Sequence, residues 1–226
     1  MAKATMRGFA SATMPAWYFR LPRSRALALW LGAPGSLSTQ IARVFGPLSV
    51  QITYQGPGRA HRDEAAALGL TTGRRVHVRE VILRCDGRPL ISARTVVEPA
   101  ALKGPWRAVA GLGSRPLAEL LFHDAGVRRS PLTYARMSPR GALGRRLAVA
   151  WQRATAQRSS GQGLWARRAV YLRRGRALLV TEVFSPAVQE RAPELARAAH
   201  SGDRTRLSPA HASLQRPRRQ NLCTGQ

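Results

Sequence analysis

Two pairs of β-rich segments, each joined by a tight turn, constrain the fold of this chain more than any other feature. "VHVREVILR" and "PLISARTVV" flank "CDGRP", whose Asp-Gly pair is a strong signal for a hairpin turn. "RRAVYLRR" and "ALLVTEVFSP" flank Arg174-Gly175 in the same way. Strands joined by such short turns cannot run parallel. With the helical segments described next, the pattern predicts an α+β fold, an antiparallel sheet of hairpins with helices on one face.

Three segments carry helix signals. "SRALALWLGAPGS" predicts a short helix ended by Gly32 and Pro34. "GSLSTQIARVFG" predicts a second helix, with Ser36 or Ser38 as its N-cap and Gly46 as its stop. "SRPLAELLFHDAG" predicts a third helix, because its leucines recur at helical spacing. "LSVQITY", which follows the second of these segments, alternates as a strand does.

The chain has 226 residues, enough for one domain with a sizeable core and extra segments at its ends. We expect residues 1–22 to be an irregular lead-in and residues 23–187 to form the domain. Residues 188–226 are basic and, in their second half, have the composition of a disordered tail.

The charge balance is extreme, with 37 Lys and Arg against 11 Asp and Glu and a net charge of +26. One interpretation is a coding bias that replaced exposed lysines by arginines. The other is a surface that binds polyanions, as in an arginine-rich nucleic-acid-binding module. The arginines are scattered, and no aromatic residues are spaced for base stacking. We therefore favour the first interpretation and expect no specific nucleic-acid partner.

Several other classes lack the residues that they require. Cys85 and Cys223 are too few for a disulfide framework or a four-ligand zinc site. The histidines show no metal-binding spacing and no nucleotide-binding glycine loop occurs, so we expect neither metal nor cofactor. No apolar stretch approaches the roughly 18 residues needed to span a bilayer. The acid-free first 62 residues resemble a transit peptide, but they run into segments that look folded. We expect a cytoplasmic protein.

Glu182 stands out because it is the only acidic residue between positions 125 and 189. Strand alternation places its side chain beside Val180 and Phe184, on a face that should be covered. The same argument places Arg79 among apolar side chains of an earlier strand. An isolated buried carboxylate costs several kcal/mol, so Glu182 needs a cation, hydrogen bonds or a proton.

Two interpretations fit this pair. Arg79 and Glu182 either form a direct buried ion pair, or they lie at opposite ends of a pocket that holds an anion and a hydroxyl.

Other charged candidates are weaker. Arg94 is expected to be a solvated strand residue rather than a second inward cation, and His77 a satisfied or edge histidine rather than a general base. No local motif supports serine or cysteine nucleophilic catalysis.

Taken in order, three blocks of sequence resemble the chorismate pyruvate-lyase family. These blocks are "REVILRCDGRPLISARTVVEPAAL", "PLAELLF" and "GLWARR…GRALLVTEVFSP". The upstream "GSLSTQIARVFG…LSVQITYQG" fits the family as well, so the resemblance covers roughly residues 28–187. Members of this family make 4-hydroxybenzoate and pyruvate from chorismate for the ubiquinone pathway.

The resemblance implies an antiparallel sheet with a closed internal cavity under helical flaps. Arg79 matches the arginine that binds the ring carboxylate, and Glu182 matches the glutamate that meets the 4-hydroxyl. Leu117 and Leu37 match further contacts made by backbone or apolar atoms. The resemblance implies chorismate as substrate and no cofactor, and we expect a monomer. The chain departs from compact members by a basic insertion around residues 135–162, which bears on the geometry of the flaps.

The same fold resembles the effector-sensing domains of some bacterial transcription regulators, which bind a small ligand without reacting. Only about 30 residues precede the domain, too few for a winged helix-turn-helix, and this counts against the regulator alternative. Turnover of chorismate separates the lyase from both the sensing domain and the nucleic-acid-binding module.

Overall fold

The computed structural model describes residues 17–137, 142–155 and 164–191. Residues 1–16 of the predicted lead-in, 192–226 of the predicted tail, and 138–141 and 156–163 of the predicted insertion lie outside the described residues. Within the described ranges, every helix is too short or too polar to span a bilayer.

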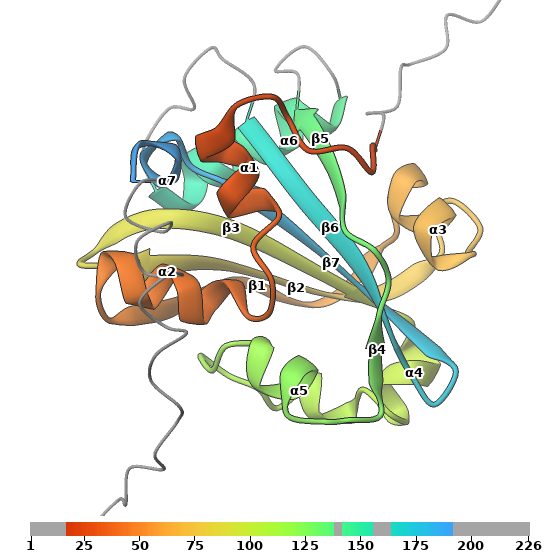
Figure 1. Cartoon of the computed structure of the whole chain (residues 1–226). Coiled ribbons are helices and arrows are strands. Elements are labelled where there is room, and N and C mark those ends of the chain that lie inside the picture. The colour runs from red at the N-terminus through yellow and green to blue at the C-terminus, as the bar shows by residue number, and fades with distance from the viewer. Residues whose placement is uncertain (1–16, 138–141, 156–163, 192–226) are drawn as a thin grey trace, which may run out of the picture.

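The strands form one open antiparallel sheet (Figure 1) in the order β1-β2-β3-β7-β6-β4, and β5 also pairs with β6. The strands of the described residues are β1 Leu48–Arg59, β2 Arg75–Cys85, β3 Arg88–Val97, β4 Val127–Arg129, β5 Thr133–Met137, β6 Leu164–Arg173 and β7 Arg176–Phe184. Every pairing is antiparallel. The predicted fold class is therefore confirmed.

Both predicted hairpins are present. Asp86 and Gly87 have φ values of 48° and 72°, and Arg174 and Gly175 have φ values of 47° and 70°. Positive φ at both central residues matches the right-handed twist of the flanking strands. The second turn places Arg173 opposite Arg176, and this sets the register of the whole β6–β7 pair.

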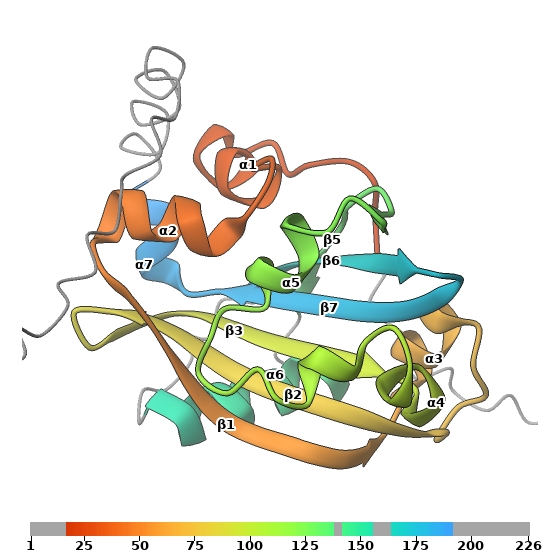
Figure 2. The same cartoon turned by 90° about the horizontal axis from the view of Figure 1, so that it is seen from below.

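Helices occupy both faces of the sheet. They are α1 Arg25–Leu31, α2 Leu37–Phe45, α3 Arg62–Leu68, α4 Pro99–Lys103, the short 3₁₀ helix η1 Arg107–Val109, α5 Ala118–Phe122, α6 Ala142–Thr155 and α7 Pro186–Glu190. In Figure 2, α4 and α5 lie in front of the sheet. Core residues of α1, α2, α4 and α5 pack on this front face, whereas α3 packs on the other face against Val78, Val96 and Leu179. The prediction that the helices lie on one face is therefore only partly correct, because α3 covers the apolar side chains of the other face.

The helix boundaries follow the predicted signals. Gly32 ends α1, and Ser36 caps α2 by accepting a hydrogen bond from Thr39 N at 3.2 Å. Gly46 ends α2 with a φ of 92°, a conformation that favours glycine. The third predicted helix is only the five residues of α5. It stops early because the following segment folds into a turn, where Asp124 Oδ1 accepts a hydrogen bond from Gly126 N at 2.8 Å.

A network of ion pairs fixes α3 to the sheet. Arg94 Nε lies 2.6 Å from Glu64 Oε1 of α3, and Arg94 Nη1 lies 2.7 Å from Glu80 Oε1 of β2. The Arg94 side chain is only 16% exposed. The expectation of a solvated Arg94 was therefore wrong, because its carboxylate partners come from α3 and a neighbouring strand. Burial alone would raise the pKa of Glu64, but the hydrogen bond and charge of Arg94 outweigh burial and lower it.

Acid should weaken this network. A carboxyl whose pKa is lowered in the folded state stabilises the protein at pH values above its ordinary pKa of 4.5. This contribution is lost as the pH falls through the folded pKa. We expect Glu64→Gln to lower the free energy of unfolding by about 3 kcal/mol at pH 7. In urea titrations the difference from wild type should shrink below pH 4.5.

The more exposed Glu98, 3.8 Å from Arg74, offers the control. Glu98→Gln should cost less than about 1 kcal/mol at pH 7. A Glu64→Gln deficit that stays constant from neutral to acidic pH would contradict the network's role.

Candidate functional site

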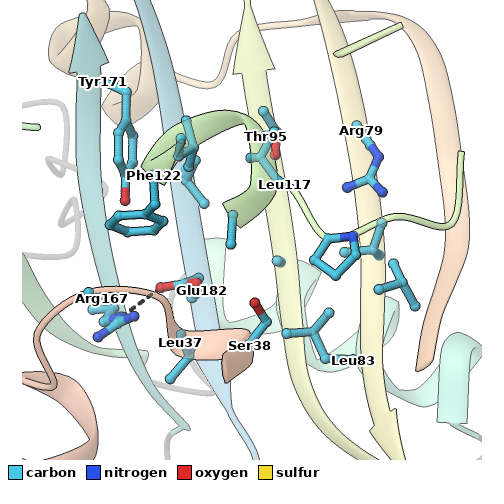
Figure 3. Close-up of a pocket in the computed structure, with 18 residues that line it drawn as sticks. Leu37, Ser38, Arg79, Leu83, Thr95, Leu117, Phe122, Arg167, Tyr171 and Glu182 are labelled. Atoms are coloured by element: carbon cyan, nitrogen blue, oxygen red, sulfur yellow. Dashed lines mark hydrogen bonds and ion pairs between the residues drawn. The ribbon is translucent and has the colours of Figure 1, made fainter. Parts of the chain in front are cut away.

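A pocket of about 560 Å³, counted out to its open mouth, lies between the front face of the sheet and the helices α2 and α5 (Figure 3). Its floor comes from β1, β2, β3, β7 and β6, and most of the lining side chains are apolar. Concave sites lined mostly by apolar side chains, with a few convergent polar groups, are typical of small-molecule sites. The polar groups of this pocket therefore decide what it can bind.

Arg79 enters the pocket from β2 and is 2% exposed. Its Nη2 donates hydrogen bonds to the carbonyl oxygens of Gly113 at 2.9 Å and Arg115 at 3.1 Å, in the loop before α5. Its Nε is buried without a hydrogen-bond partner, and no acidic side chain of the described residues forms an ion pair with it. Burial lowers the pKa of Arg79, but an arginine stays charged in proteins. A buried cation with an unused donor is suited to an anionic ligand.

Glu182 enters the same pocket from β7. Its Oε2 lies 2.6 Å from Nε of Arg167, and the two residues are directly opposite in the β6–β7 register. The direct pairing of Glu182 with Arg79, one of the two interpretations of the sequence, does not occur. The pocket separates the two residues, as Figure 3 shows, and Arg167 supplies the cation that Glu182 needs.

Leu37 and Leu117 also line this pocket. Leu37 is the first residue of α2 and is 3% exposed. Leu117 immediately precedes α5 and is half-buried. The structure therefore brings all four predicted residues, Leu37, Arg79, Leu117 and Glu182, to one pocket. Their individual roles stay predictions.

Among the pocket residues that the sequence analysis missed are Arg167, Tyr171 and Phe122. The signal for Arg167 was present, because counting back from the turn at Arg174-Gly175 places it opposite Glu182. Tyr171 is 7% exposed and its hydroxyl is directed towards Phe122 in Figure 3. Burial, and then the negative charge of Glu182, raise the pKa of Tyr171, so its hydroxyl is a hydrogen-bond donor at neutral pH.

The pocket is not sealed, in contrast to the closed cavity that the resemblance implied. Phe122, the last residue of α5, lines the pocket and is 42% exposed. The Glu182 side chain is itself 20% exposed. Two of the residues that line the pocket, Phe122 and Glu182, are therefore accessible to solvent.

Groups suited to other chemistry lie elsewhere. Within the described ranges, no three His, Cys, Asp or Glu side chains gather where they could hold a metal ion. His77 is half-buried and is not among the residues that line the pocket. Its Nε2 is buried without a hydrogen-bond partner in the described part of the chain, and burial lowers the pKa of its ring.

A family model described as chorismate lyase matches residues 22–193. The chain belongs to the chorismate lyase family. The match spans every element from α1 to α7, and thus the whole pocket. Among its relatives, a probable chorismate pyruvate-lyase of Albidiferax ferrireducens is 43% identical over 156 residues, covering 69% of this chain and 79% of the relative.

A second probable chorismate pyruvate-lyase, from an Azoarcus species, is 41% identical over 175 residues, covering 76% of this chain and 91% of the relative. Among solved structures, the effector domain of PhnF from Mycobacterium smegmatis is similar with a TM-score of 0.44 and 16% sequence identity. That similarity covers 68% of this chain and 90% of the PhnF domain.

The Arg79 end of the pocket can be tested with benzoate, which carries a carboxylate but no hydroxyl. At a hundred times its Kd, a ligand that binds only the folded state raises the free energy of unfolding by about 2.7 kcal/mol. We expect this increase for the wild type. Arg79→Gln should lose most of it at the same benzoate concentration, as measured by urea unfolding with and without benzoate.

Arg84→Gln is the matched control, because Arg84 lies on the same strand and outside the pocket, with its Nε 2.7 Å from Gln51 Oε1. This variant should keep the full benzoate effect. If Arg79→Gln keeps it too, Arg79 is not the anion site.

Proposed function

We propose that the protein is a chorismate pyruvate-lyase, which converts chorismate to 4-hydroxybenzoate and pyruvate. The observation that carries the proposal is one apolar pocket with an uncompensated buried arginine at one end and a carboxylate at the other. Membership of the chorismate lyase family supports the same conclusion. The reaction would be the first step of ubiquinone synthesis and would take place in the cytoplasm.

The two ends of the pocket suit the two ends of the ring. The Gly113 and Arg115 carbonyls hold Nη2 of the Arg79 guanidinium, whereas its Nε donor is unused. This Nε donor would bind the ring carboxylate. Glu182 uses Oε2 for Arg167, which leaves Oε1 to accept a hydrogen bond from the 4-hydroxyl. A charge-assisted hydrogen bond at each end would hold the ring in one orientation.

The reaction itself requires few catalytic groups from the protein. The bond between C3 and the ether oxygen breaks, and its electron pair leaves with the enolpyruvyl group. The hydrogen on C4 departs as a proton, its electron pair completes the aromatic ring, and protonation of the enolpyruvyl methylene carbon gives pyruvate. Aromatisation provides the driving force, so the contribution of Arg79 and Glu182 is orientation and stabilisation of charge.

The basic surface suits the substrate, because chorismate carries two carboxylates. With a net charge of +26, the protein presents a positive potential that raises the encounter rate of a dianion. Added salt should reduce this contribution, since exposed charges are screened.

The direct test is incubation of purified protein with chorismate. We expect equal amounts of 4-hydroxybenzoate, followed by ultraviolet absorbance, and pyruvate, followed by reduction with lactate dehydrogenase and NADH. A protein that is folded by circular dichroism and gives no product would contradict the lyase proposal. Binding without turnover would instead favour a ligand-sensing domain.

Within this assay, Glu182→Gln should lower kcat on the order of 100-fold, the size of effect that loss of one charged group at a reacting centre produces. The effect on KM should be smaller, because Arg79 still binds the carboxylate. Glu98→Gln, whose residue is not among those that line the pocket, should have wild-type turnover. Wild-type turnover in Glu182→Gln would reduce Glu182 to a structural residue.

A further inference from the structure

Arg167 is held by more contacts than its pairing with Glu182. Its side chain is 3% exposed, and its Nη1 donates to the carbonyl oxygens of Leu31 at 3.2 Å, Ala33 at 3.3 Å and Trp30 at 3.5 Å. Its guanidinium also lies 5.8 Å from the centre of the Phe184 ring. The position of this guanidinium is therefore fixed by groups that do not belong to the pocket.

The three carbonyls lie at the C-terminal end of α1 and just beyond it. Carbonyls at a helix end lack partners within the helix, and the end carries partial negative charge that favours a cation. Arg167 satisfies these carbonyls with one nitrogen and Glu182 with another. Because the α1 end anchors Nη1, the Nε donor presents a stationary hydrogen bond to the carboxylate.

This hydrogen bond gives the two carboxylate oxygens of Glu182 different roles. Oε2 is held by Arg167 at 2.6 Å, whereas Oε1 has no hydrogen-bond partner among the residues that the structure describes. A carboxylate fixed at one oxygen cannot rotate freely, so the other oxygen stays directed at one place in the pocket. A hydroxyl at that place gains a hydrogen bond, and a hydrogen atom there gains none.

We propose that Arg167 is a positioning residue, which holds Glu182 so that the pocket selects a ring bearing a hydroxyl opposite its carboxylate. The inference rests on the proposed function and deepens it, since it names the residue that makes the hydroxyl end selective. Arg167 acts through Glu182, while Arg79 binds the carboxylate that all such rings share.

A comparison of two ligands tests this role. Isothermal titration calorimetry gives the Kd of 4-hydroxybenzoate and of benzoate for each variant. The ratio of the two Kd values measures the contribution of the hydroxyl to binding. For the wild type we expect 4-hydroxybenzoate to bind on the order of 10-fold to 100-fold more tightly, the range for one hydrogen bond to a charged group. In Arg167→Gln the ratio should fall to within about threefold of unity, mainly through weaker binding of 4-hydroxybenzoate.

Arg167→Lys provides a second variant that keeps the positive charge and most of the length of the side chain. A single ammonium replaces the fork that joins Glu182 to the α1 carbonyls, so the ratio should lie between those of the wild type and Arg167→Gln. This variant carries the test if Arg167→Gln does not fold.

Arg168→Gln is the matched control on the next residue of the same strand. The Arg168 side chain is mostly buried, at 15% exposed, but Arg168 is not among the pocket residues and pairs with Asp63 at 3.5 Å. It should keep the wild-type ratio even if its stability falls. A role for Arg167 in folding alone would weaken both ligands equally and leave the ratio unchanged.

The outcomes separate this inference from the proposed function. An unchanged ratio in both Arg167 variants overturns the positioning role even if the wild type turns over chorismate. A wild type that binds the two ligands equally overturns it together with the hydroxyl contact at Glu182. Absence of chorismate turnover with a ratio that falls in the Arg167 variants contradicts the lyase proposal and supports the positioning role.

Discussion

The pairing of β6 with β7 across the turn at Arg174-Gly175 is the constraint on which the candidate site depends. It puts Arg167 directly opposite Glu182, so a strand face that is otherwise apolar can carry a carboxylate without leaving it unpaired. Burial of two charges is tolerated only when geometry and further hydrogen bonds compensate for lost hydration. The α1 carbonyls supply those bonds, and the same contacts link α1 to the pocket.

The sheet keeps its two sets of buried charges on opposite faces. On the front face, Arg79 lacks a carboxylate partner within the described residues, and the pocket lies beside it. On the other face, Arg94 is fully paired with Glu64 and Glu80, and the space is filled by α3. The contrast separates a structural arginine from one available to a ligand, and it comes from the alternation of side chains along β2 and β3.

Much of this arrangement could be predicted from local sequence. The Asp-Gly and Arg-Gly turns gave the hairpins, and alternation within β2 and β7 placed Arg79 and Glu182 on covered faces. What failed depended on groups that are distant in sequence. Glu64 lies 30 residues before Arg94 on a helix that was not predicted. The register of β2 with β3 shifts at a bulge between Leu83 and Arg84, so counting from the turn does not give the residue opposite Arg94. Arg167 was missed because each strand was considered without counting across its hairpin.

The central claim is that Arg79 and Glu182 bind the two ends of one aromatic ring. The most direct measurement is a crystal structure of the protein with 4-hydroxybenzoate. We expect the carboxylate at Nε of Arg79, the hydroxyl at Oε1 of Glu182, and the Arg167–Glu182 contact unchanged at 2.6 Å. A ligand bound in the reverse orientation or outside this pocket, or an Arg79 that pairs with Glu182 and closes the pocket, would contradict the account.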